Sequence, residues 1–158
     1  RSSDLARHFL EQGRRRFEAE SQPQVLKEAG RFFEALTEGR YRQVVAPLED
    51  YRLLAVTRQG LPLPAEHLSR GTLEQLYLAL RCALVRSYDQ QGINLPLVLD
   101  EVLVNFDHRR GRQAVRLLGE MSGTHQILLF TCHRHMVDLI KEALGPEAPT
   151  PIILEDSR

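Results

Sequence analysis

Two neighbouring carboxylates follow a short apolar run, and this is the pattern in the chain best suited to chemistry. Asp100 and Glu101 come directly after the run at residues 95–99. In an open parallel sheet, ligands bind beyond the carboxyl ends of the strands, so a strand ending here would present both acids to a ligand. One carboxylate can hold a magnesium ion through water, and the other can orient an attacking water or accept its proton. Two solvated acids at a strand end would give the same pattern.

A Ser-Arg-Gly-Thr segment precedes an apolar stripe of helical spacing over residues 73–84. At a helix start, Ser69 and Gly71 would present a hydroxyl and free backbone N–H groups, and the helix dipole adds positive potential there. Such a turn suits the terminal phosphate of a nucleotide. An ordinary helix cap, made by Ser69 or Thr72, is the alternative reading.

One histidine follows a second apolar run. His133 comes two residues after the run at 126–131, and a histidine at a strand end can donate a hydrogen bond to phosphate oxygens. A surface histidine, or one that only supports a site from behind, is the commoner case. Each of the three signals is weak alone, but a phosphate-binding turn, an acidic strand end and then a histidine is a rare order by chance.

The elements that must position these residues alternate in type. Residues 4–20 predict a charged helix that packs on a segment outside the sequence, ends a coiled coil, or frays at the surface. Ser21 opens a stronger helix that Gly39 ends. The rest predicts strands and helices of an α/β domain with a mostly parallel sheet. We expect strands at 51–57, 95–99, 126–131 and 152–154, a turn at 59–64, and helices at 73–84, 114–121 and 136–144. The strands at 95–99 and 126–131 are expected to be buried.

Composition limits the function classes. The chain has 158 residues, which fits one ordinary domain, and 21 basic residues balance 21 acidic ones. This balance gives no electrostatic case for binding nucleic acid or a membrane surface. Cys82 and Cys132 lie too far apart to suggest a zinc site or a disulfide framework, which indicates a reduced, cytoplasmic setting. The first residue is Arg1, which favours a piece of a longer protein, although removal of a tag would look the same.

At these same residues the sequence resembles the ABC ATPase superfamily. The resemblance rests on four segments: LSRGTLEQLYLALR at 68–81 is similar to the signature motif and its helix, LPLVLDE at 95–101 to the Walker B strand, VNFD at 104–107 to the D-loop, and LLFTCH at 128–133 to the switch histidine. Two segments, FFEALTEGRY at 32–41 and QLYLALRCAL at 75–84, resemble the SMC, SbcC and YhaN-like group. In that group a long coiled coil leads into the C-terminal lobe of the head.

The resemblance implies roles for individual residues. It makes Asp100 the residue that helps hold magnesium, Glu101 the general base or water-orienting residue, His133 the sensor of the γ-phosphate, Asp107 a dimer-interface residue, and Ser69, Arg70 and Gly71 contacts to ATP held by the opposite subunit. Two positions depart from the family pattern. Arg70 stands where Gly is usual, and Thr72 stands where Gln or Glu is common.

The Walker A loop of this family is absent from the sequence. No G-x-x-x-x-G-K-[ST] occurs among the 158 residues, so ATP and Mg2+ would both need an N-terminal lobe placed upstream of the coiled coil. The expected organisation is a helical segment at 1–40 and the C-terminal lobe of the head at 41–158. The implied partners are that lobe and a second head. DNA and a nuclease subunit are further partners that the resemblance allows but does not require.

The function implied is therefore half of an ATP-hydrolysing head in DNA repair or chromosome maintenance, inactive alone. A non-catalytic scaffold that keeps the head fold for dimerisation is the alternative. An unrelated α/β module is the third reading.

Overall fold

The computed structural model describes residues 24–47 and 52–154, and these form two compact units that divide between Leu95 and Pro96. The predicted helix at 4–20, its neighbour Ser21 and the start of the predicted strand at 51–57 lie outside the described residues.

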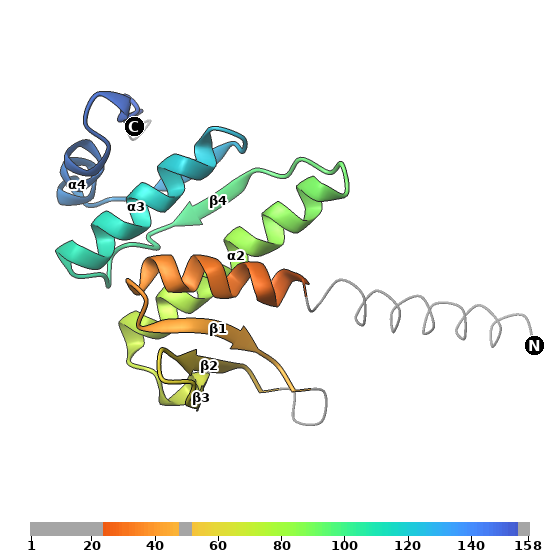
Figure 1. Ribbon diagram of the computed structural model, residues 1–158. Coiled ribbons are helices and arrows are strands. Elements are labelled where there is room, and N and C mark those ends of the chain that lie inside the picture. The colour runs from red at the N-terminus through yellow and green to blue at the C-terminus, as the bar shows by residue number, and fades with distance from the viewer. Residues whose placement is uncertain (1–23, 48–51, 155–158) are drawn as a thin grey trace, which may run out of the picture. The chain divides into compact units, whose positions relative to one another are not determined.

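The first unit combines a helix at 24–36, a small antiparallel sheet and a long helix (Figure 1). The sheet has the order β1 (Tyr41–Val45), β2 (Leu54–Thr57) and β3 (Pro62–Pro64), and all of its pairs are antiparallel. A short 3-10 turn, η1 (Ala65–His67), leads into helix α2 (Arg70–Gln90). The predicted helix at 73–84 is confirmed and is longer than its apolar stripe.

The helix at 24–36 packs directly on the sheet. A Cβ at Gly30 would meet the backbone of Gln43 and Val44 at 3.3 Å, so the helix backbone approaches β1 closely. The Phe33 ring stacks on Tyr41 with 5.0 Å between ring centroids. Gly39 adopts a φ of +78° and donates its N–H to Glu34, which confirms the predicted helix end at this glycine.

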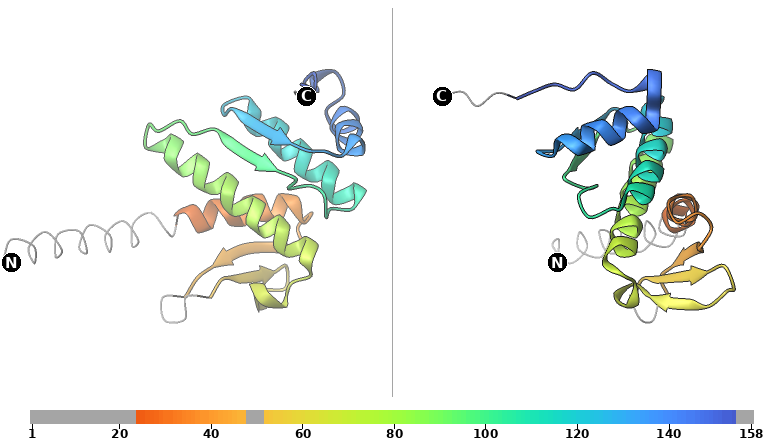
Figure 2. Two further views of the ribbon diagram at one scale, coloured as in Figure 1. Left: turned by 180° about the vertical axis from the view of Figure 1, so that it is seen from behind. Right: turned by 90° about the vertical axis from the view of Figure 1, so that its left-hand side faces the viewer.

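The second unit is a β–α–β–α arrangement. Strand β4 (Leu97–Asp100) pairs in parallel with β5 (Ile127–Phe130), α3 (His108–Ser122) connects them, and α4 (Arg134–Leu144) follows β5 (Figure 2). A 3-10 turn, η2 (Gly145–Glu147), comes after α4. Both predicted parallel strands and both predicted helices are confirmed here.

Helices α3 and α4 pack against each other through glycine positions. A Cβ at Gly111 would meet the Leu139 side chain at 2.6 Å, and one at Gly119 would meet Leu144 at 2.6 Å. These small residues let the two helices approach closely, and the apolar face of α3 is buried at Ala114, Val115, Leu117, Leu118 and Met121. Among the helices of the described residues, none has the length and apolar character needed to cross a bilayer.

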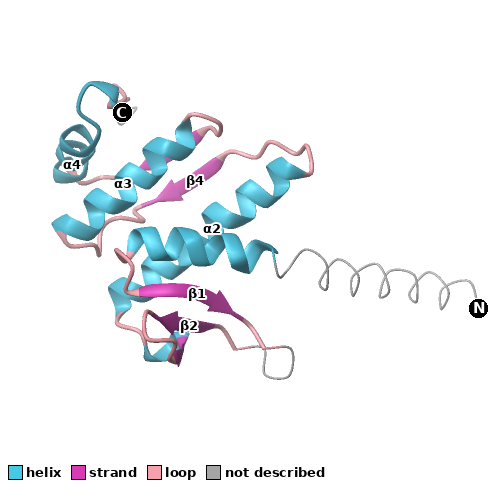
Figure 3. Ribbon diagram, in the orientation of Figure 1, coloured by secondary structure: helices cyan, strands magenta, loops and turns pink. Residues whose placement is uncertain are grey.

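The observed helices and strands differ from the expected ones in four respects (Figure 3). The sheet is not mostly parallel: within the described residues only β4 and β5 pair in parallel. No strand forms at 152–154, where the side chains stay 78–88% exposed because no neighbouring strand pairs with them. The predicted turn at 59–64 contains β3, and β1 forms where no strand is expected.

The two parallel strands are not fully buried as expected. Leu97 and Leu99 are buried, but Val98 is 54% exposed, and Leu128 and Phe130 of β5 are also exposed. The parallel strands are therefore covered on one face and open on the other in this unit.

Candidate functional site

The ends of β4 and β5 bring together Glu101 and His133, two of the residues singled out in the second unit. Glu101 follows β4, and its N–H donates to the Phe130 carbonyl at 3.0 Å, which continues the ladder by one step. His133 lies three residues beyond β5. Its Nε2 is 4.0 Å from Glu101 Oε2, so the acid and the histidine lie side by side at the two strand ends.

Both carboxylate oxygens of Glu101 are held by the segment after β5. The Cys132 backbone N–H donates to Oε1 at 2.6 Å, and the Thr131 hydroxyl donates to Oε2 at 3.0 Å. The Thr131 oxygen also accepts the backbone N–H of His133 at 3.1 Å. Thr131 thereby links the acid to the histidine backbone, a role that sequence reasoning missed. The sequence feature that could have indicated this role is the position of Thr131 just before Cys132 and His133 at a strand end.

The Glu101 backbone is strained. Its φ is +49°, a left-handed conformation that is uncommon for residues other than glycine. Such strain persists only where surrounding structure holds it, and it gathers at functional sites. Here the turn after β4 points the Glu101 side chain toward the end of β5, while Asp100 stays exposed at the last position of β4. The two adjacent acids thus differ in environment.

These contacts shift the pKa values of Glu101 and Cys132. Hydrogen bonds from the Cys132 side chain and backbone, with smaller contributions from the Thr131 hydroxyl and the nearby His133, lower the pKa of Glu101 from 4.5 to about 2. The same carboxylate raises the pKa of the Cys132 thiol, because it accepts that thiol's hydrogen bond. Glu101 is therefore an anion at neutral pH, and Cys132 is a protonated thiol.

The Ser-Gly turn lies in the first unit, at the start of α2. Ser69 is the N-cap of α2, accepting the Thr72 N–H at 3.4 Å and sharing a hydrogen bond with the Thr72 hydroxyl at 2.8 Å. The capping alternative weighed for Ser69 is therefore confirmed. Thr72 is buried beneath it, and Gly71 lies within the first turn of the helix. Arg70 points into solvent and pairs with Glu74 at 3.3 Å.

Asp107 also caps a helix. Its carboxylate accepts the Arg110 N–H at 2.9 Å at the start of α3, and it lies 3.4 Å from the Arg110 side chain. The Asp107 side chain is 61% exposed, so one helix-capping role is filled and the residue remains reachable from solvent.

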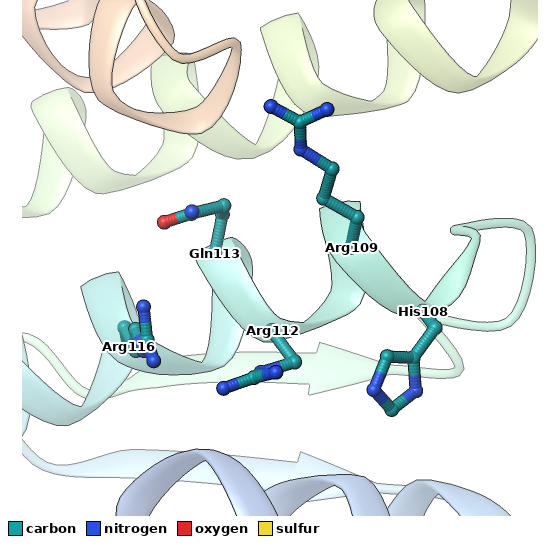
Figure 4. A pocket seen from close by; sticks show the side chains of 5 residues that line it. All are labelled: His108, Arg109, Arg112, Gln113 and Arg116. Carbon is teal, nitrogen blue, oxygen red and sulfur yellow. The ribbon is translucent and has the colours of Figure 1, made fainter.

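The first turns of α3 also line a shallow pocket of about 220 Å3, shown in Figure 4. Its lining is cationic and contains none of the predicted site residues: His108, Arg109, Arg112, Gln113 and Arg116. Glu142 of α4 lies 3.3 Å from both His108 and Arg112, which offsets part of this charge.

The fold is that of the C-terminal part of SMC-type ATPase heads. The solved SMC head domain from Thermotoga maritima matches 84% of this chain and 44% of its own length, with a TM-score of 0.54 and 24% identity. The head domain with a coiled coil and joint from Pyrococcus yayanosii matches 86% of this chain and 26% of its own, with a TM-score of 0.64 and 17% identity. A structure described as concerning ATP-driven dimerisation and DNA-stimulated activation of SMC ATPases matches 78% of this chain and 73% of its own, with a TM-score of 0.61 and 16% identity.

Within that class, the chain belongs to the SMC/YhaN-like group. It is 42% identical over 118 residues to the uncharacterized protein YhaN of Bacillus subtilis (strain 168). The match covers 73% of this chain but only 12% of YhaN. No family model matches the sequence.

Proposed function

We propose that this chain is the C-terminal lobe of an ATP-hydrolysing ABC-type head, in which Glu101 acts on the attacking water and His133 contacts the γ-phosphate. The observation that carries the proposal is the 4.0 Å approach of His133 Nε2 to Glu101 Oε2 across two strand ends. Ligands of open parallel sheets bind at this edge, and phosphoryl transfer depends on positioning water and stabilising charge there.

The low pKa of Glu101 refines its role. A carboxylate with a pKa of about 2 is a poor proton acceptor at neutral pH, because general bases work best with a pKa near the operating pH. In this state Glu101 is suited to orienting water. For it to accept a proton, the hydrogen bonds from Cys132 and Thr131 must first loosen, which would raise its pKa.

Asp100 fits the implied magnesium ion. It offers exposed carboxylate oxygens at the end of β4, next to Glu101, and hard cations take oxygen ligands, often through water. When bound, the ion supplies charge neutralisation for the phosphates. Asp100 would hold it through water.

An N-terminal lobe completes the proposed head. The two-stranded sheet has an open apolar face, made by Val98, Leu128 and Phe130. We expect an additional part of the protein to cover this face. The match to only 12% of YhaN is consistent with a much longer protein. We place the Walker A loop there, beyond a coiled coil, so ATP and Mg2+ bind only when both lobes are present.

The signature turn would act in trans. The positive end of the dipole of α2, a helix of 21 residues, lies at the Ser69 turn. Ser69 and Gly71 would there contact the γ-phosphate held by a second head. Arg70 could join them only by leaving its pairing with Glu74. Asp107 would lie at the same dimer interface. A role in DNA repair or chromosome maintenance, with DNA and a nuclease subunit as partners, follows only from the likeness to the SMC group.

The test is Glu101→Gln in the full-length protein. We expect ATP turnover to fall roughly 100- to 10,000-fold, the usual contribution of a positioned acid or base, and ATP-bound dimers to accumulate in size-exclusion chromatography. Glu120→Gln is the matched control, since Glu120 is exposed on α3 outside the site. Unchanged turnover in Glu101→Gln would refute the assignment. ATP-dependent dimers without hydrolysis in the unsubstituted protein would favour the scaffold alternative.

A further inference from the structure

Three different ligand types meet at the ends of β4 and β5. A Glu101 carboxylate oxygen, the Cys132 sulfur and a His133 ring nitrogen all lie within 4.8 Å of one another. The Glu101 and His133 side chains are 31% and 40% exposed, and Cys132 is also exposed. An ion in solvent can therefore reach all three groups.

The combination of oxygen, sulfur and nitrogen selects a class of metal. Mg2+ prefers oxygen ligands, whereas a set of thiolate and imidazole suits Zn2+ and similar borderline cations. In tetrahedral zinc sites with metal–ligand bonds of about 2.0–2.3 Å, neighbouring ligand atoms lie about 3.3–3.7 Å apart. The three groups here need to close by roughly 1 Å, which small side-chain rotations supply.

We propose that Glu101, Cys132 and His133 form a binding site for Zn2+, with water in the fourth position. On binding, the Cys132 thiol releases its proton to solvent and the sulfur forms the bond to the metal. The carboxylate and the thiolate together balance the two positive charges of the ion. No electron transfer is involved.

The existing hydrogen bonds support the site. A carboxylate has about four acceptor positions, so Glu101 can bind a metal while it still accepts from the Cys132 backbone N–H and the Thr131 hydroxyl. Hydrogen bonds of this kind orient metal ligands and strengthen binding. Thr131 also holds the His133 backbone, so it fixes the loop that carries two of the three ligands.

Occupancy has a consequence that rests on the proposed function. A metal held by Glu101 and His133 would remove both groups from the attacking water and the γ-phosphate. Zn2+ would then inhibit ATP hydrolysis at this site, even in the presence of Mg2+. The binding itself does not depend on that function.

The binding test uses Co2+ as a coloured substitute for Zn2+ in the full-length protein. We expect an absorption band from thiolate bound to Co2+, which Cys132→Ser abolishes and one equivalent of Zn2+ displaces, while millimolar Mg2+ leaves it unchanged. The control Cys82→Ala should keep the band, because Cys82 is buried. His133→Asn should weaken Co2+ binding by more than about tenfold, and His135→Asn, its neighbour on α4, should not. An absorption band that survives Cys132→Ser would overturn the site, and so would equal Co2+ affinity of His133→Asn and His135→Asn.

The activity test separates this proposal from the catalytic one. The ratio of ATP turnover without and with Zn2+ is measured in the unsubstituted protein and in Cys132→Ser. We expect strong inhibition that Cys132→Ser relieves. If Co2+ binds as expected but Zn2+ leaves turnover unchanged, the metal site stands and the catalytic assignment of Glu101 and His133 fails.

Discussion

Gln75 holds helix α2 against the helix at 24–36 through one buried hydrogen bond. Its side chain is 2% exposed, and its Nε2 donates to the Leu36 carbonyl at 2.6 Å. Leu36 is the last residue of its helix, so its carbonyl is one of those that a helix end leaves without a partner inside the helix. Replacing Gln75 by Met keeps the approximate shape of the side chain and removes the donor.

The expected loss follows from that geometry. Leaving a buried acceptor without its donor costs about 1–3 kcal/mol, and the apolar methionine regains a part of it, so we expect a net loss of about 1–2 kcal/mol. For a chain of this size, that corresponds to a fall of about 2–8 °C in Tm. Gln75→Glu should cost more, because it places a carboxylate oxygen against the carbonyl oxygen.

The assay is urea and thermal unfolding, followed in the near-ultraviolet circular dichroism that the stacked Phe33–Tyr41 pair gives to this unit. Gln91→Met is the control, since the Gln91 side chain donates to the Ser87 carbonyl in an exposed setting near the end of α2. If Gln75→Met and Gln75→Glu both unfold with the free energy of the unsubstituted chain, the hydrogen bond does not stabilise this unit.

Three other predictions concern single groups. Burial raises the pKa of the Cys82 thiol from 9.0 to about 12, so its contribution to stability is complete below pH 9 and is lost as pH rises toward 12; unfolding of Cys82→Ala should lack this alkaline slope. The Glu101 carboxyl should titrate near pH 2 by NMR, and its stabilisation should be present above about pH 4.5 and fade as pH falls below it; an unchanged titration in Thr131→Val would exclude Thr131 as a cause. Asp107→Ala should lower the free energy of unfolding by about 1 kcal/mol through loss of the α3 cap, and Asp107→Asn should retain it; equal stability of all three forms would show that the cap is dispensable.

Local patterns predict much of the second unit. The apolar runs before Asp100 and Thr131 are long enough and bounded well enough to indicate strands, and the helical spacing at 114–121 and 136–144 indicates helices. Local patterns predict less of the first unit. Strand β1 has apolar residues at three of its five positions but no alternation of apolar and polar residues, and β3 contains two prolines. Contact of β1 with the helix at 24–36, and the pairing of both strands with β2, favour these strands more than their own composition does.

The sequence by itself determined which residues could do chemistry: Asp100 and Glu101 after one apolar run, His133 after another, and a Ser-Gly turn before a helix. Only the tertiary structure decided how they combine. Parallel pairing of β4 with β5 carries the residue after each strand to the same edge, so Glu101 meets Thr131, Cys132 and His133 across some thirty intervening residues. Cysteine spacing along the chain argued against a metal, whereas this pairing puts one cysteine beside an acid and a histidine. The reason is physical: ligand geometry depends on distances in space, and sequence spacing constrains those distances only within a single helix, strand or turn.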